Sequence, residues 1–96
     1  DGKTLRTTTE QLKNELGAAV IILAGVDGDK VALVAGVTKA ESQRVKAGDM
    51  LSMVARQIGG KGGGRADMAQ GGGGDPAGVP AALKSVNAWV AQQLQS

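Results

Sequence analysis

Residues 18–37 read AAVIILAGVDGDKVALVAGV, and the architecture of this 96-residue chain depends on how they fold. The runs at 18–26 and 31–37 are short, apolar and rich in β-branched side chains, and the turn-forming pair Asp27-Gly28 lies between them. Two such runs around a tight turn predict a β-hairpin. Because both runs are apolar at nearly every position, we expect strands that are covered on both faces, with helices packed on at least one of them.

A helix is expected before this hairpin, in TLRTTTEQLKNELG. The leucines between Leu5 and Leu16 are spaced by seven and four residues, as on one face of a helix, and Gly17 is a natural C-terminal cap. Three consecutive threonines lower the helix propensity of the first half, so the helix is predicted to begin near Thr8 or Thr9.

Two more helices are expected after the hairpin. Thr38 and Glu41 stand three residues apart, which is the spacing of a capping box, and they predict a helix that ends at Ala47-Gly48. Asp49 is placed to cap the next helix, DMLSMVARQIGG, in which methionines and aliphatic residues form one stripe. The glycine pair at the end of this segment is expected to terminate it.

The last third of the chain holds a glycine stretch, a short strand RADMAQ, a loop over Gly71–Gly78 and a final helix. That helix, VPAALKSVNAWVAQQLQ, has Pro80 in its first turn, where helices accept proline. The predicted fold is therefore a small single domain, residues 1–96, of the α/β (α+β) class. A short β-sheet with a hairpin is expected to be packed with about four helices.

The composition excludes several kinds of protein. The chain has no cysteine and no histidine, so disulfides, thiolate zinc sites, cysteine nucleophiles and Ser-His-Asp triads are excluded within it. The longest apolar run, Ala18–Val26, is too short to span a bilayer. The missing initiator methionine before Asp1 indicates a piece of a longer protein.

The net charge is only +2, but the charges are unevenly placed. The segment Lys39–Arg65 holds six basic and two acidic residues, whereas the rest of the chain holds five basic and seven acidic residues. A basic middle favours an anionic partner for that part of the chain. A helix face that is basic and simply solvated is the alternative.

The stretch GGKGGGRADMAQGGGG, residues 59–74, contains nine glycines among sixteen residues. An interdomain linker is disfavoured, because the residues after it are too few for a second domain. A glycine loop inside one domain can adopt positive φ, as we expect at Gly63, and present consecutive N–H groups to an anion. Nucleotide-binding motifs fit poorly, since neither Ser nor Thr follows Lys61. A purely structural loop is the alternative.

We expect the site to combine the charges of Lys61 and Arg65 with the backbone amides between them, and Asp67 to orient the arginine. Trp89 is the only aromatic residue, so a nucleic-acid contact should read shape and backbone instead of stacking a series of bases. A metal-dependent hydrolase is disfavoured, because nothing holds Asp67 and Asp75 together. The candidate nucleic-acid-binding residues are Lys61, Arg65, Gly60, Gly62, Gly63, Gly64, Arg44 and Lys46.

The segment GGKGGGRADMAQGGG resembles the glycine motif of the C-terminal globular (DHH-associated) domains of bacterial alanyl-tRNA synthetases. Its usual form there is GGKGGGRPDMAQ followed by more glycines. The resemblance extends to LRTTTEQLKNELG, VIILAGVDGDKVALVAGV, RVKAGDM and PAALKSVNAWV, and so it covers nearly the whole chain. Ala66 departs from the pattern, because proline is usual there, and this puts the local rigidity of the loop in question.

The resemblance implies a non-catalytic tRNA-binding module of an alanine–tRNA ligase. The module is expected to contact the tRNA elbow, where the D and T loops meet, and to help the aminoacylation and editing domains act on the same tRNA. The implied partners are tRNA(Ala) and the rest of the synthetase, with weak self-association, no membrane and a cytoplasmic location. The parent enzyme is implied to use ATP, magnesium and zinc, and no cofactor is expected in this fragment.

Two alternatives stay open. The chain can be a protein-interaction or oligomerisation module whose glycine loop is structural. It can also be the nucleic-acid-gripping domain of a DHH-family phosphoesterase, although the glycine motif of those domains usually carries a histidine, which this chain lacks.

Overall fold

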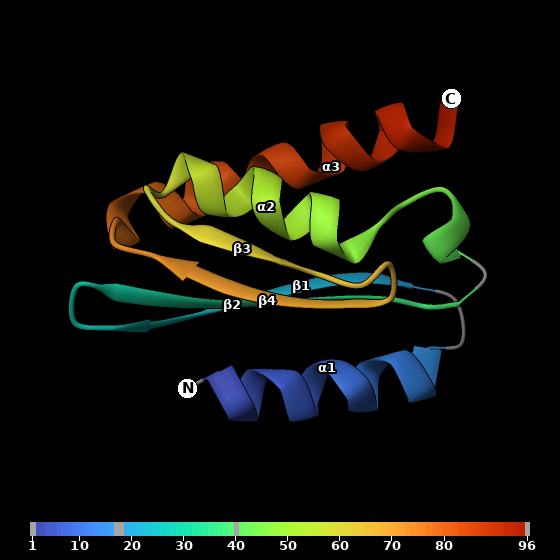
Figure 1. Ribbon diagram of the computed structural model, residues 1–96, viewed down its shortest axis with the longest axis horizontal. Coiled ribbons are helices and arrows are strands. Elements are labelled where there is room, and N and C mark those ends of the chain that lie inside the picture. Colours follow the sequence, from blue (N-terminus) through green and yellow to red (C-terminus); the bar gives the residue numbers. More distant parts are fainter. Residues whose placement is uncertain (1, 17–18, 40, 96) are drawn as a thin grey trace.

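The computed structural model describes residues 2–16, 19–39 and 41–95, so the cap expected at Gly17 lies outside the described residues. The chain forms three layers, with one helix on one side of a four-stranded sheet and two helices on the other side (Figure 1). The fold class predicted from the sequence is confirmed. The helices are α1 (Gly2–Leu16), α2 (Ala47–Gln57) and α3 (Val79–Gln95), and the strands are β1 (Val20–Asp27), β2 (Lys30–Val37), β3 (Lys61–Gly64) and β4 (Met68–Gly73).

The predicted hairpin forms one half of the sheet, with β1 at the edge and β2 inside. All neighbouring strands are antiparallel, and their order is β1-β2-β4-β3. β1 and β2 pair from Val20–Val37 to Asp27–Lys30, and the turn between them places Gly28 at a φ of 64°. Because Asp29 does not share this positive φ, the turn has the character of type II′, whose twist suits a two-residue hairpin.

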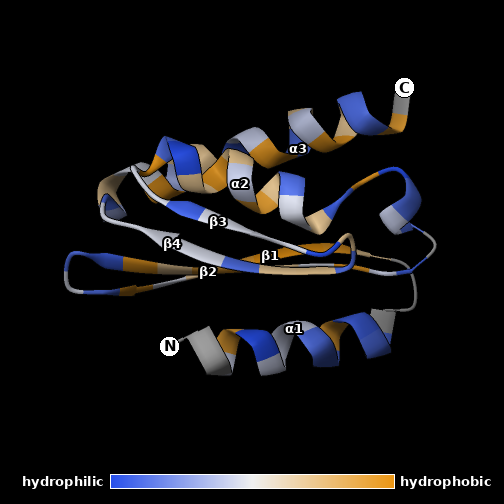
Figure 2. Cartoon of the chain, in the orientation of Figure 1, coloured by the Kyte–Doolittle hydropathy of each residue, from blue (hydrophilic) through white to orange (hydrophobic). Residues whose placement is uncertain are grey.

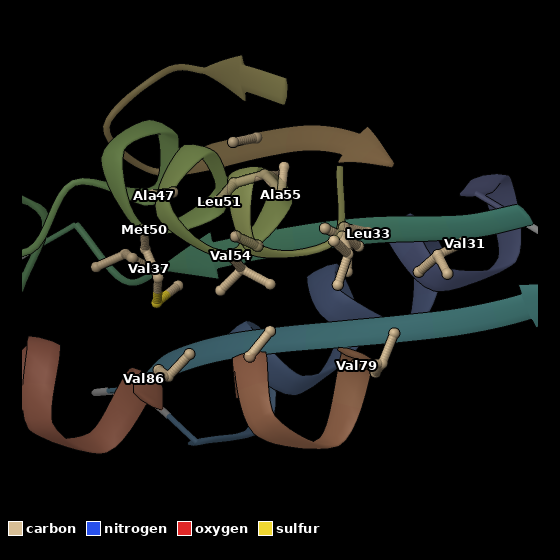
Figure 3. Close-up of a cluster of buried hydrophobic side chains, with 14 of the residues drawn as sticks. Val31, Leu33, Val37, Ala47, Met50, Leu51, Val54, Ala55, Val79 and Val86 are labelled. Carbon is tan, nitrogen blue, oxygen red and sulfur yellow. The ribbon is translucent and has the colours of Figure 1, made fainter. Parts of the chain in front are cut away.

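The hydrophobic core lies between the sheet and the layer of α2 and α3 (Figure 3). Leu33 and Val37 of β2 pack there with Met50 and Leu51 of α2, and all four side chains are buried. Burying a side chain of this size contributes about 1.5–3 kcal/mol. The strands β1 and β2 are largely hydrophobic, whereas β3 and the end of β4 are near neutral or hydrophilic (Figure 2). The apolar strands β1 and β2 are those that α1 covers on the face opposite the core, as their sequence predicts.

Helix α1 begins at Gly2, so the start expected near Thr8 or Thr9 is wrong. Thr9 is fully buried, and its hydroxyl donates a hydrogen bond of 2.8 Å to the Leu5 carbonyl. Its methyl group faces the bare backbone of Gly36 on β2. Contact with the sheet therefore outweighs the low helix propensity of the threonines.

The helix expected between Thr38 and Ala47 is reduced to a 3₁₀ turn, η1 (Glu41–Gln43). The Thr38 hydroxyl accepts a hydrogen bond of 3.0 Å from the Ala19 N–H and donates a hydrogen bond to the Glu41 carboxylate. Thr38 therefore ties the end of β2 to the start of β1, and this use of its side chain replaces the predicted capping role.

Helix α2 begins at Ala47-Gly48, where the sequence predicted a stop, and the expected cap, Asp49, lies inside its first turn. The Ala47 N–H donates to the Ala66 carbonyl (2.8 Å), and the Gly48 N–H donates to the Arg65 carbonyl (3.0 Å). Carbonyl groups of the glycine stretch thus satisfy N–H groups that a capping side chain would otherwise bind.

The glycine stretch is a hairpin of β3 and β4 and not a loop. The strand expected at 65–70 begins at Met68 and runs to Gly73, through part of the loop expected at 71–78. The strand β3 was not predicted, because three of its four residues are glycines and show no pattern of side chains. A 3₁₀ turn, η2 (Pro76–Gly78), leads into α3, whose predicted bounds are confirmed.

Candidate nucleic-acid interface

A groove runs between α1 and the β3–β4 hairpin. α1 packs over β1 and β2, so it leaves the same face of β4 and β3 uncovered. The groove has two adjoining compartments of about 470 and about 770 Å³. Both volumes fall in the range of about 300–1,000 Å³ that is usual for ligand sites. The compartments share three lining residues, which are Lys13, Arg65 and Asp67.

The side chains around the groove are mainly cationic. Helix α1 contributes Arg6 and Lys13, the segment after β2 contributes Lys39, and the turn between β3 and β4 contributes Arg65. Glu10 and Asp67 are the two carboxylates among the lining residues, which leaves an excess of positive charge. An excess of this sign on a surface groove attracts anionic ligands.

Part of the floor of the first compartment is bare backbone, at Gly63. Successive residues of a strand face opposite sides of a sheet. A Cβ atom added at Gly62 would lie 3.3 Å from Cγ of Leu51, so Gly62 faces α2. Gly63 faces the other side, lines the groove, and has no atom within 4 Å of an added Cβ. The groove therefore reaches the main chain of β3 directly.

The turn at the tip of the β3–β4 hairpin is held by backbone hydrogen bonds. The Arg65 N–H donates to the Met68 carbonyl (2.8 Å), and the Asp67 carbonyl accepts from the Val37 N–H (2.9 Å). The same Asp67 carbonyl accepts a bond of 3.0 Å from Nζ of Lys13, which connects α1 to the tip. These bonds place Arg65 and Lys13 on opposite sides of one groove.

Arg65 is exposed, and its guanidinium bonds to no other side chain in the described part of the chain. The expected bond from Asp67 to Arg65 is therefore absent. Among the described residues the only ion pair joins Nε of Arg6 to Oε1 of Glu10 at 3.3 Å, and both side chains are more than half exposed. An exposed pair of this kind contributes little stability, so Arg6 is available to an anion at small cost.

The structure brings together only part of the predicted site. Arg65, Gly63 and Gly64 line the groove. Lys61 lies at the far end of β3, paired with Gly72, and Gly62 faces α2. The expectation of positive φ at Gly63 is wrong. Gly62 and Gly63 belong to the extended strand β3 and lack positive φ, so they do not form the expected nest of amides. Arg44 and Lys46 are exposed beside η1, outside the lining residues, and Nζ of Lys46 donates to the Ser42 carbonyl (3.1 Å).

Sequence reasoning missed Arg6 and Lys13. Both lie on α1, seven residues apart and so about two helical turns from each other. This spacing indicates that they share a helix face, but it does not indicate which part of the sheet that face meets. Lys39 belongs to the basic middle of the chain, and its place beside the hairpin tip was not predicted.

None of the described helices has the length and apolar character needed to cross a membrane. Within the described residues, no three His, Cys, Asp or Glu side chains gather closely enough to hold a metal ion.

Comparison with known proteins identifies the class of this fold. The DHHA1 domain family matches residues 1–92, and the chain therefore belongs to that family. The crystal structure of the C-Ala domain from Aquifex aeolicus alanyl-tRNA synthetase is similar, with a TM-score of 0.82 and 38% identity. The match covers 88% of this chain and 76% of that chain.

The curated relatives lead to one particular enzyme. The chain is 63% identical over 94 residues to alanine–tRNA ligase of Delftia acidovorans and 57% identical to that of Burkholderia thailandensis. Each match covers 98% of this chain but only 11% of the relative. The predicted resemblance is confirmed, and the region matched is the C-terminal, non-catalytic domain of alanyl-tRNA synthetase.

Proposed function

We propose that this domain is a tRNA-binding module that contacts the elbow of tRNA(Ala). In this function it helps the aminoacylation and editing domains of an alanyl-tRNA synthetase act on the same tRNA. The observation that carries the proposal is the cationic groove over the bare backbone of β3, in a chain that belongs to the DHHA1 family. Positive side chains beside accessible main chain suit a phosphate backbone, and the only aromatic residue, Trp89, is on α3 in the opposite layer.

The proposal extends to the setting of the module. Its partners are tRNA(Ala) and the rest of the synthetase, with weak self-association, and it acts in the cytoplasm. ATP, magnesium and zinc serve the other domains of the parent enzyme. The similarity to alanine–tRNA ligases over 98% of this chain supports this setting.

The direct test compares two RNAs. Binding of folded tRNA(Ala) is measured by fluorescence anisotropy at several salt concentrations, and the same tRNA with its D-loop/T-loop contact disrupted serves as the control. We expect weaker binding to the disrupted tRNA, and an affinity for both that falls steeply with salt. Equal affinity for the two RNAs would overturn the elbow contact. A tight dimer in sizing experiments, indifferent to RNA, would favour the protein-interaction module instead.

A further inference from the structure

Gly63 has no structural reason to be a glycine. Its φ is not positive, and a Cβ atom added there would have no atom within 4 Å. Glycine in a strand weakens the strand, because it loses more backbone conformational entropy on folding than other residues and has no side chain to pack. Its neighbour Gly62 is different, since an added Cβ would come within 2.9 Å of the Cα of Gly71. The backbone at Gly63 is therefore kept bare at a place where folding does not require it.

The open side of Gly63 is the floor of the cationic groove. On β4, Gln70 pairs with Gly63 and lines the groove beside it, as does Met68. Arg65 and Lys13 line the same groove. A glycine inside a strand often marks a site where a ligand approaches the main chain closely. The sign of the groove and the bare main chain at Gly63 point to the same kind of ligand, an anion that lies against the backbone.

We propose that this groove holds consecutive phosphate groups of an RNA strand, and that Gly63 is the floor against which the sugar–phosphate backbone lies. The inference rests on the proposed function, because it assigns the surface by which the domain binds RNA. The two compartments meet at Lys13 and Arg65, so a strand that follows the groove passes both cations. The planar fork of Arg65 suits one phosphate, and the ammonium group of Lys13 acts as a point charge on another.

The first test fills the floor without removing charge. Gly63→Val adds a β-branched side chain that strands favour, in open space and without positive φ. Gly74→Val is the matched control, because Gly74 also has open space and no positive φ but does not line the groove. We expect Gly63→Val to keep the melting temperature of the wild type. Its tRNA affinity should fall about tenfold or more, which corresponds to the loss of one hydrogen bond to a charged phosphate. Gly74→Val should bind like the wild type.

The second test removes charge without filling space. Lys13→Met keeps the aliphatic stem beside Gly36, and Arg65→Gln changes an exposed side chain. Arg56→Gln and Lys84→Gln change exposed cations on α2 and α3, in the opposite layer, and serve as controls. Each groove variant should make the negative slope of log K against log salt shallower by about one, where K is the association constant for tRNA. The controls should leave the slope unchanged.

The outcomes separate the two proposals. If the wild-type chain does not bind tRNA at any salt concentration, the proposed function fails. A second outcome is that the wild type binds, that the Gly63 and Gly74 variants bind equally well, and that groove and control charge variants have the same effect on the salt slope. In that case the groove assignment fails and the proposed function stands. If Gly63→Val lowers the melting temperature, Gly63→Ala and the two groove charge variants still decide the assignment.

Discussion

Ala66 lies at the first central position of the turn that joins β3 to β4. Its carbonyl accepts the hydrogen bond from the Ala47 N–H, whereas its own N–H forms no hydrogen bond with the described residues. Its φ is not positive, and proline favours the first central position of common turns. A proline at this position would therefore keep every hydrogen bond of the tip.

We predict that Ala66→Pro raises the free energy of unfolding by about 0.4–1 kcal/mol, because proline lowers the conformational entropy of the unfolded chain. Urea denaturation, followed by the fluorescence of Trp89, measures the change. Ala66→Gly is the matched control and should shift stability in the opposite direction. A decrease in stability for Ala66→Pro would show that the backbone of this turn does not match the geometry of proline.

At the scale of elements, α1 is placed by one close contact with the sheet. Thr9 on α1 is fully buried against Gly36 on β2, and an added Cβ at Gly36 would overlap the Cγ2 methyl of Thr9. The same added atom would lie 3.1 Å from Cδ of Lys13, so the stem of this groove cation also rests on Gly36. The position of one wall of the groove therefore depends on a glycine in β2, an inner strand of the sheet.

We predict that Gly36→Ala destabilises the fold by about 1–3 kcal/mol, because the added methyl forces α1 away from the sheet. Thr9→Ser removes the opposing methyl and keeps the hydroxyl that bonds to Leu5, so it should offset part of this loss in the double variant. A thermodynamic cycle from chemical denaturation gives the coupling. Additive effects of the two substitutions would contradict a direct contact between them.

The elements that were predicted well are those whose side chains show a pattern. The hairpin at 18–37 is apolar with a clear turn, and α3 has an apolar stripe with Pro80 in its first turn. The strand β3 has one lysine and three glycines, and its place depends on pairing with β4 and packing against α2. Thr38 and the start of α1 were mispredicted for a similar reason, because distant contacts outweighed local preference.

At the scale of the whole molecule, the groove joins parts of the chain that are far apart in sequence. Arg65 and Gly63, which line the groove, could be named from the sequence as candidate site residues, because they belong to the glycine motif. Lys13 could not, since its part in the groove arises only when α1 packs beside the hairpin tip and bonds to Asp67. The positive charge of the candidate site could thus be predicted from the distribution of basic residues along the chain. The shape of the groove could be known only from the folded structure.

The bonds from the start of α2 to the carbonyls of Arg65 and Ala66 have a thermodynamic consequence for the RNA binding that we propose. A glycine loop that became ordered on binding would lose about 1–2 kcal/mol per residue in conformational entropy. Here the tip is already fastened to the core. We therefore predict a small change in heat capacity when the domain binds tRNA, measured by calorimetry at several temperatures.

A large negative change in heat capacity would instead indicate that the hairpin folds as it binds. The ordered tip leads to a simple view of this glycine-rich segment. In the proposed site, the bare main chain at Gly63 lets a phosphate approach closely, while that main chain itself stays in place. The affinity for RNA should therefore owe little to induced folding and depend strongly on the salt concentration.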